Sequence, residues 1–151
     1  MPRRKKLVKV FLDSSVVFSA FHSDTGGSMR IVREAFEYDI RLVISPRVIE
    51  EAVSSLTEKY PHTVPLFPRW LEHAKFSIVP KPSPRLVKQF EKIIASNDAP
   101  ILAAAQRAKA DVLVTLDRKD FIDNVAVRKA QLPFTIFTPG DFIKKYFDAN
   151  L

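Results

Sequence analysis

The sequence of 151 residues contains no cysteine, which excludes a disulfide framework and any metal site built on thiolates. Its apolar runs are much shorter than the ~20 residues that cross a membrane, so we expect no transmembrane segment. The opening MPRRKK leads into a short alternating strand and not into an apolar stretch, which argues against a signal peptide. By elimination, we expect an intracellular, cytoplasmic protein without a membrane partner.

Acidic residues are in the minority, since 17 Asp and Glu stand against 24 Lys and Arg, for a net charge of +7. Such a balance favours an anionic partner, of which nucleic acid is the commonest. The basic residues are scattered along the chain apart from one dense run, Arg3 to Lys6. The charge therefore supports a nucleic-acid partner without establishing one.

Short apolar segments alternate with helix-like segments along the whole chain. This alternation predicts an α/β fold with a mainly parallel, twisted sheet of four to five strands and helices on both faces. The length favours a single domain over residues 1–151. We expect strands at residues 7–12, 41–45, 75–79, 112–114 and 134–138, an irregular proline-rich stretch at 61–74, and helices near 14–21, 28–37, 46–59, 85–95, 98–110 and 141–147.

Acids recur where the expected strands end and the expected helices begin. Asp13 ends the first strand, Asp117 lies two residues beyond the fourth, and Asp98 lies in the first turn of a helix. Strand ends and helix starts share one edge of a parallel sheet, where ligands bind. Glu50 and Glu51 follow on the helix opened by Ser45 and Pro46, and one of them leans back toward the same edge. The helical angles do not choose between these two glutamates.

Each acid taken singly also has a structural explanation. Asp13 could cap a helix, Asp98 could favour a helix dipole, and Asp117 could shape a turn. Other residues are available as caps, however, which leaves the acids free for chemistry. The expected caps are Ser14 or Ser15, Ser45 and Asn97.

Gathering several carboxylates in one place is costly. Two like charges about 4 Å apart repel by about 1 kcal/mol in water and about 4 kcal/mol at an effective dielectric of 20. A cluster therefore needs raised pKa values or a cation, and oxygen-only ligands select Mg²⁺ or Mn²⁺ over zinc. A carboxylate-bound divalent ion on a basic protein points to phosphodiester hydrolysis. We expect replacement of Asp13 or Asp98 by Asn to abolish activity and to leave stability unchanged or raised.

The sequence resembles the PIN domain family in four blocks, which together cover nearly the whole chain. The blocks are VFLDSSVVFSAF, LVISPRVIEEAVSSL, NDAPILAAAQRAKADVLVTLDRKDF and IFTPGDFIKKY. The third block, an aspartate-led alanine-rich helix followed by a strand and T-x-D, is the specific part. The pattern is most similar to the prokaryotic branch of VapC-like toxins from toxin–antitoxin systems.

The resemblance implies a three-layer PIN-like fold, a ribonuclease acting on single-stranded RNA with Mg²⁺ or Mn²⁺, an antitoxin partner and a homodimer. It carries the acids of the family's catalytic site onto this chain, with Glu51 favoured over Glu50. It also assigns metal ligands, among them the less constant acid Asp120, and two supporting hydroxyls. The implied catalytic residues are Asp13, Glu51, Asp98 and Asp117, the metal ligands Asp13, Asp98, Asp117 and Asp120, and the supporting residues Ser14 and Thr115.

Other readings fit the residues less well. A dehalogenase-type phosphatase needs a second acid at Ser15, and a receiver domain needs paired acids where Asp13 stands alone. The serious rival is a catalytically weak PIN fold that binds RNA or a protein. The segment around Trp70 is expected to pack over the core, with a partner surface as the alternative.

Overall fold

The computed structural model describes residues 7–150, so the basic run at residues 3–6 lies outside the described part of the chain. Five parallel strands form one sheet in the order β3-β2-β1-β4-β5. The α/β class and the parallel sheet predicted from the sequence are therefore confirmed. The strands are β1 (Val8–Leu12), β2 (Ile40–Ile44), β3 (Ser77–Ile78), β4 (Val112–Val114) and β5 (Thr135–Phe137).

The sheet is most apolar at its centre, where strands are covered on both faces. Val10, Phe11 and Leu12 of β1 are fully buried, as are the neighbouring residues of β4. Such continuous apolar runs are typical of parallel strands between two layers of helices. β3, in contrast, is a two-residue edge strand whose residues are both exposed.

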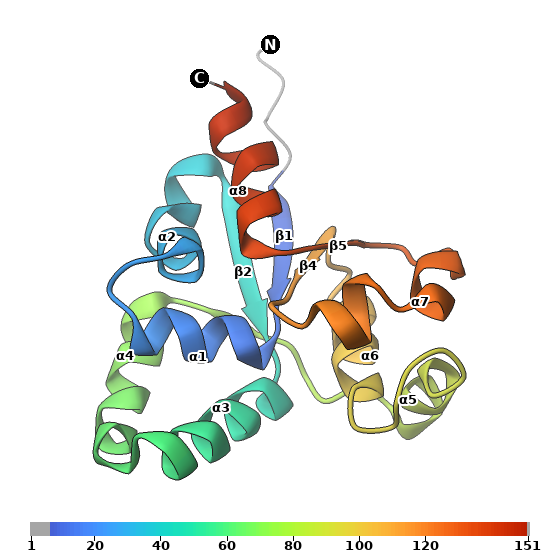
Figure 1. Ribbon diagram of the computed structural model, residues 1–151, viewed down its shortest axis with the longest axis horizontal. Helices are drawn as coiled ribbons and strands as arrows, with labels where there is room; N and C mark the ends of the chain where they lie inside the picture. Colours follow the sequence, from blue (N-terminus) through green and yellow to red (C-terminus); the bar gives the residue numbers. More distant parts are fainter. Residues whose placement is uncertain (1–6, 151) are drawn as a thin grey trace.

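Helices flank the sheet on both sides. Figure 1 shows α1 to α4 on one side of β1 and β2, and α5 to α7 on the other. The helices are α1 (Ser14–His22), α2 (Gly27–Glu34), α3 (Pro46–Lys59), α4 (Phe67–Ala74), α5 (Pro84–Phe90), α6 (Ala99–Arg107), α7 (Val125–Lys129) and α8 (Pro139–Tyr146). Shorter helical segments are the 3₁₀ turns η1 (Ala35–Tyr38), η2 (Pro61–Leu66) and η4 (Asp148–Asn150), and the π-helical turn η3 (Arg118–Ile122).

Several predicted elements differ from the observed ones. The helix expected at 85–95 ends at Phe90, and residues 91–98 continue as turns. After Phe90 the backbone hydrogen bonds tighten to three-residue spacing, from the Lys92 N–H to the Gln89 carbonyl and from the Ile93 N–H to the Phe90 carbonyl, which ends the α-helix. The helix expected at 28–37 is divided into α2 and η1, which closes at Asp39 in the left-handed region (φ 57°). The two elements η3 and α7 were not predicted.

Trp70 packs as expected against aromatic rings of the core. Its ring makes edge contacts with Phe21 and Phe76, with centroid distances of 5.4 and 5.8 Å.

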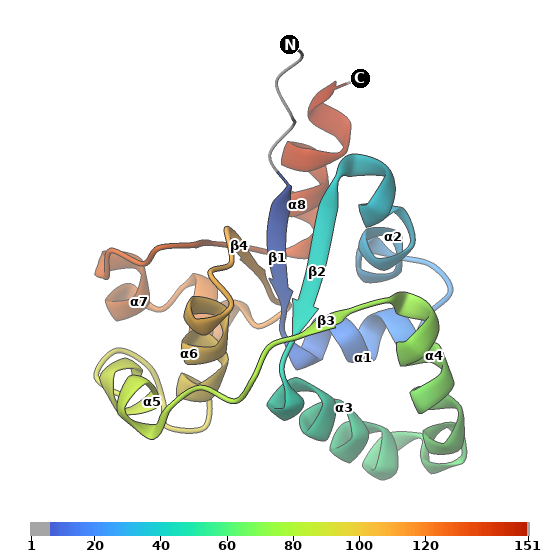
Figure 2. The same cartoon turned by 180° about the vertical axis from the view of Figure 1, so that it is seen from behind.

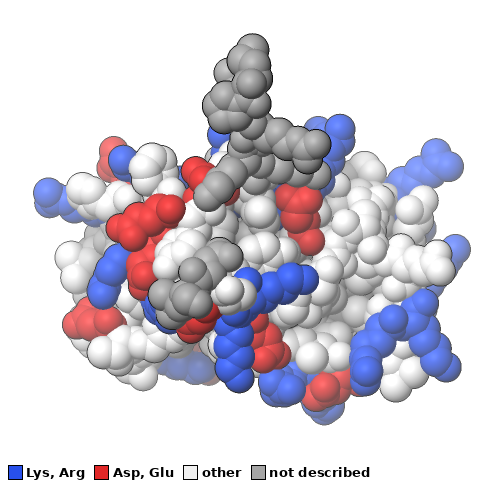
Figure 3. Space-filling model, turned by 90° about the horizontal axis from the view of Figure 1, so that it is seen from above, with Lys and Arg blue, Asp and Glu red and all other residues white. Residues whose placement is uncertain are grey.

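In the part of the chain that the structure describes, no helix combines the length and apolarity needed to cross a membrane. Figure 3 shows Lys and Arg side chains scattered over the described part of one face of the molecule.

Candidate functional site

The starts of α1, α3 and α6 meet at the carboxyl edge of the sheet, directly beyond β1 and β4. Asp13 follows the last residue of β1 and is buried there. Its Oδ1 accepts the backbone N–H of Ser14 at 2.8 Å, and its Oδ2 accepts the hydroxyls of Ser15 at 3.1 Å and Thr115 at 2.7 Å. Asp13 is thus held in one orientation by donors from the first turn of α1 and from Thr115, the residue directly after β4.

Thr115 joins the two central strands at this edge. Its hydroxyl is fully buried, donates to Asp13 Oδ2 and accepts the backbone N–H of Asp117 at 3.0 Å. Ser15 makes a similar bridge, because its hydroxyl also accepts the backbone N–H of Leu116 at 3.1 Å. These two hydroxyls fix the direction in which the chain leaves β4.

Three acids come close together on the α6 side of the site. Asp98, Asp117 and Asp120 each offer a carboxylate oxygen, and these three oxygens lie within 4.8 Å of one another. Asp117 Oδ1 accepts the backbone N–H of Asp120 at 2.9 Å, which begins the π turn η3. Asn124 holds the far end of that turn by donating to the Asp120 carbonyl at 3.0 Å and to the Ile93 carbonyl at 3.3 Å.

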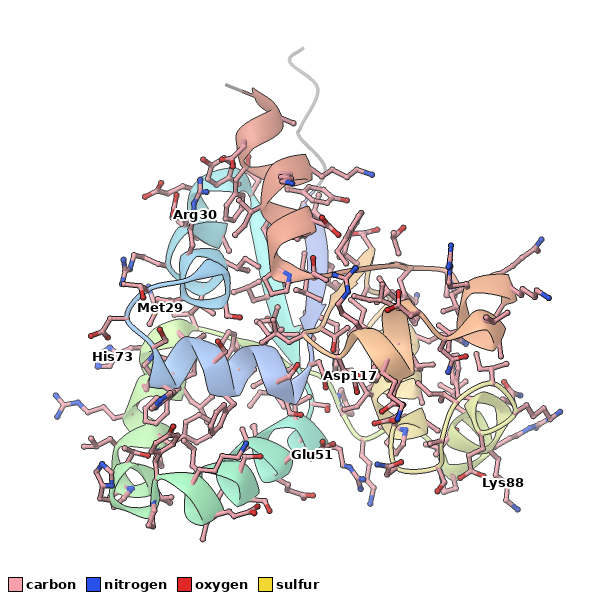
Figure 4. All side chains as sticks on the ribbon, viewed as in Figure 1. Met29, Arg30, Glu51, His73, Lys88 and Asp117 are labelled. Atoms are coloured by element: carbon pink, nitrogen blue, oxygen red, sulfur yellow. The ribbon has the colours of Figure 1, made fainter. Side chains whose placement is uncertain are left out.

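Glu51 reaches the site from α3, on the opposite side. Its Oε2 accepts the Ser14 hydroxyl at 3.2 Å, and its Oε1 accepts Arg47 Nε at 3.0 Å. Figure 4 shows Glu51 and Asp117 facing each other between α3 and the turn after β4. Glu50 instead lines a neighbouring pocket. The structure therefore directs Glu51, and not Glu50, toward the other acids.

Burial and mutual repulsion raise the proton affinity of the clustered acids. Desolvation, together with the charges of Asp120, Asp117, Asp13 and Glu51 in that order, raises the pKa of Asp98 to about 6. Desolvation also raises the pKa of Asp13, and the donors Thr115, Ser14 and Ser15 oppose that change. The site thus carries more negative charge than the described residues around it compensate.

The expected division between capping residues and chemical residues is wrong for α1, whereas for α6 only the expected cap, Asn97, is wrong. Asp13 itself caps α1, whereas Ser14 and Ser15 donate to it. α6 begins after Asp98 and not after Asn97, and the Asp98 side chain makes no capping hydrogen bond. Asp13 therefore has two roles. Its short carboxylate lies directly before α1, so it caps the helix and also belongs to the acidic site.

Ser45 fulfils its expected role, since its hydroxyl accepts the backbone N–H of Val48 at 3.3 Å and Pro46 is the first residue of α3. Pro at this position costs nothing, because its missing N–H would have no helical partner. This cap fixes the start of α3, and Glu51 follows about one and a half turns later. The capping serine therefore determines where the Glu51 carboxylate lies.

Two residues of the site were missed by the sequence analysis. Arg47 donates from Nη2 to the Asn97 carbonyl at 3.3 Å, in addition to its bond with Glu51, and so connects α3 to the segment before α6. Asn124 anchors η3, which places Asp120 beside Asp117. The (i, i+4) spacing of Arg47 and Glu51 could have indicated the first contact. No local sequence signal indicates the π turn.

The donor set fits a hard divalent cation. The three clustered acids supply oxygen ligands only, which suits Mg²⁺ or Mn²⁺. Ser14 has a single hydroxyl proton, which it shares between Glu51 at 3.2 Å and Asp13 Oδ1 at 3.4 Å. When that proton goes to Glu51, Asp13 Oδ1 keeps a lone pair free for a ligand. His73 lies far from Glu51 and Asp117 (Figure 4).

Fold and site together define a parallel α/β protein with a carboxylate-lined site at the carboxyl edge of its sheet. The PIN domain family profile matches residues 10–127, and the chain belongs to this family. No curated protein sequence matches the chain significantly. The family match agrees with the resemblance stated from the four sequence blocks.

Solved structures share the fold at low sequence identity. The chain is similar to VapBC2 from Rickettsia felis bound to a promoter DNA fragment, at 15% identity over 87% of this chain and 98% of that chain, with a TM-score of 0.64. It is also similar to DNA-bound VapBC from Salmonella typhimurium, at 12% identity over 87% and 98%, with a TM-score of 0.62. A third is VapC20 from Mycobacterium tuberculosis, described as a sarcin–ricin loop cleaving toxin, at 12% identity over 73% and 91%, with a TM-score of 0.55.

Proposed function

We propose that the protein is a divalent-metal-dependent endoribonuclease that hydrolyses phosphodiester bonds in single-stranded RNA. The observation that carries this proposal is the convergence of Asp98, Asp117 and Asp120 within 4.8 Å, with Asp13 and Glu51 beside them. Membership of the PIN domain family supports a nuclease role for these acids. The ions that suit the site are Mg²⁺ and Mn²⁺.

In this proposal the acids of the site divide into two groups with different roles. Asp98, Asp117 and Asp120, together with the free lone pair of Asp13, would hold the ion, which supplies a polarised phosphoryl oxygen and an acidified water when bound. Glu51 lies opposite, with Oε1 on Arg47 and Oε2 on Ser14. In this proposal Glu51 orients the attacking water and accepts its proton.

Exposed cations adjoin the acids and would hold the RNA backbone. Arg118 and Lys119 are exposed residues of η3, between Asp117 and Asp120 in the sequence. Arg47 lies on the α3 side and leaves part of its guanidinium edge free for a phosphate. Phosphates bound on both sides would deliver the scissile group to the acids.

We also propose that the protein is the toxin of a toxin–antitoxin pair, works in the cytoplasm, binds an antitoxin protein and forms a homodimer. The support is the similarity to VapBC complexes from two bacteria and to a VapC protein described as a sarcin–ricin loop cleaving toxin. Co-expression with the product of an adjacent small reading frame tests this part. We expect expression of the protein alone to stop growth and co-expression of the partner to restore it, whereas normal growth in both cases would contradict this part of the proposal.

The activity is tested with single-stranded RNA in the presence of Mn²⁺ or Mg²⁺, compared with EDTA. We expect cleavage with either ion, loss of cleavage in EDTA, and a reduction of about 10²-fold or more in Asp98→Asn, because one missing ligand weakens ion binding. Asp24→Asn is the matched control, since Asp24 is an exposed acid outside the site. RNA that binds but is never cut with any of these ions would establish the rival binding module.

A further inference from the structure

A cavity lined by Arg47 adjoins the acidic site. It has a volume of about 380 Å³ and lies between the first turn of α3, the segment after β3, α5 and the first turn of α6. Figure 2 shows the segment between β3 and α5 passing the start of α3 on its way to α5. We propose that this cavity receives the nucleobase next to the scissile phosphate of single-stranded RNA. This inference rests on the proposed nuclease function.

Arg47 connects the cavity to the acids. Its guanidinium lines the cavity, donates from Nε to Glu51 at 3.0 Å and donates from Nη2 to the Asn97 carbonyl at 3.3 Å. A strand of RNA with one phosphate at the acids therefore has its next nucleotide beside Arg47. The planar guanidinium offers a stacking surface for a base as well as free N–H donors for a phosphate.

The cavity walls are apolar and rigid. Pro46, Pro82, Val87 and Pro100 contribute ring and methyl surface, and they come from four separate elements or connections. Each proline fixes its own backbone φ, so the wall needs little ordering when a ligand binds. The volume lies within the range of small-molecule sites in proteins, and a nucleobase is a flat, largely apolar group that suits such walls.

The charges in the cavity decide which part of a nucleotide enters. Glu50 and Glu91 line it, and they repel a phosphate but accept hydrogen bonds from the N–H groups of a base. Lys81 and Lys88 also line it and are exposed, which places cations where the backbone would pass. Figure 4 shows Lys88 on α5, across from Glu51 on α3. The base enters, and its phosphates stay on Arg47 and the lysines.

The test uses an RNA oligonucleotide whose cleaved bond has been located by product length. An abasic nucleotide is then placed on one side of that bond and, in a second oligonucleotide, on the other. For the unmodified protein we expect one of the two replacements to raise KM about tenfold, the factor that corresponds to ~1.4 kcal/mol. A base that is not recognised on either side would leave KM unchanged in both cases and overturn the proposal.

Two variants then locate the effect in the cavity. Val87→Trp fills it, so KM for the complete oligonucleotide should rise about tenfold and the abasic replacement should add nothing further. Val87→Ala widens it without crowding and should raise KM about threefold. Val125→Trp is the control, because Val125 is 59% exposed on α7 and lies outside the cavity. A Val87→Trp protein that folds and keeps the normal KM and abasic penalty contradicts the proposal.

Binding separates this proposal from the nuclease proposal. Fluorescence anisotropy of the same oligonucleotides in EDTA reports base recognition without cleavage. Weaker binding in Val87→Trp, together with no cleavage by the unmodified protein, would refute the nuclease function and support the cavity as a base-binding site. Normal cleavage with equal binding by all variants and oligonucleotides would refute the cavity alone.

Discussion

Replacing Asp98 by Asn should stabilise the protein in the absence of divalent ions. Desolvation and neighbouring acids raise the pKa of Asp98 from 3.8 to about 6, so its charged form is unfavourable in the folded state. A shift of this size corresponds to about 3 kcal/mol at 1.36 kcal/mol per pKa unit. Asp98 is only half-buried, however, and solvent screening reduces the expected gain to about 1 kcal/mol. For a domain of this length, that amounts to about 2–4 °C in Tm.

The sign of this effect depends on pH. Below the unfolded pKa of 3.8, Asp98 is protonated in both states, and the Asn variant gains nothing. The stability contributed by the protonated carboxyl is lost as the pH rises through about 6, so the full advantage of Asn is present at pH 7–8. Urea or thermal unfolding in EDTA at pH 4 and pH 8, with Asp24→Asn as control, measures the difference.

The opposite result at pH 8 would refute the electrostatic argument. If Asp98→Asn unfolds more easily than the unmodified protein in EDTA, the carboxylate makes a stabilising contact that the repulsion does not outweigh. Addition of Mg²⁺ or Mn²⁺ provides a second check. An ion that binds the folded state stabilises it by mass action, and we expect the unmodified protein to gain more than the variant.

Three further changes test the hydrogen bonds around the site. Asp13→Asn should lose activity and also about 1–2 kcal/mol of stability in urea unfolding. The reason is that the new amide donor faces the hydroxyl donors of Ser15 and Thr115. Unchanged stability would show that these hydroxyls reorient freely. Thr115→Val should cost about 2 kcal/mol of stability and lower the cleavage rate. Thr115→Ser keeps both hydrogen bonds and should lose about half as much stability. Equal losses of stability in the two variants would assign the effect to packing. Ser45→Ala should cost about 1 kcal/mol through its lost cap, and a similar loss in the exposed control Ser54→Ala would contradict that cause.

The hydrogen bonds at Asp13 also revise an expectation drawn from the sequence. Asn was expected to be neutral or favourable at both Asp13 and Asp98, since each replacement relieves repulsion. At Asp98 that argument stands, because the side chain makes no capping hydrogen bond. At Asp13 the relief competes with the loss of hydrogen bonds from the hydroxyls of Ser15 and Thr115. The position of an acid at the end of a strand predicts that it lies near other acids of the site. It does not predict which hydrogen-bond donors surround its carboxylate.

The sequence predicted the parts of the fold that follow from strong local signals. The apolar run of β4 and the Ser45-Pro46 start of α3 are such signals, and both elements occur where they were expected. The π turn η3 has no comparable signal, because it depends on the Asp117 carboxylate accepting the Asp120 N–H and on Asn124 reaching Ile93. The helical angles alone did not separate Glu51 from Glu50; the family resemblance favoured Glu51, and its hydrogen bond from Ser14 is a tertiary contact that no local pattern predicts.

The acids of the site differ in how completely the protein itself satisfies them. Asp13 accepts several donors, Asp117 accepts a backbone N–H, and Glu51 is bonded to Ser14 and Arg47. The carboxylates of Asp98 and Asp120 accept no hydrogen bond from the described residues, and Asp98 lies among the charges of the other four. A cation would therefore gain most from these two acids, and below a pH of about 6 a proton competes for the oxygens of Asp98. Because burial and the neighbouring charges raise the pKa of Asp98, the pH dependence of ion binding should follow this carboxylate most steeply.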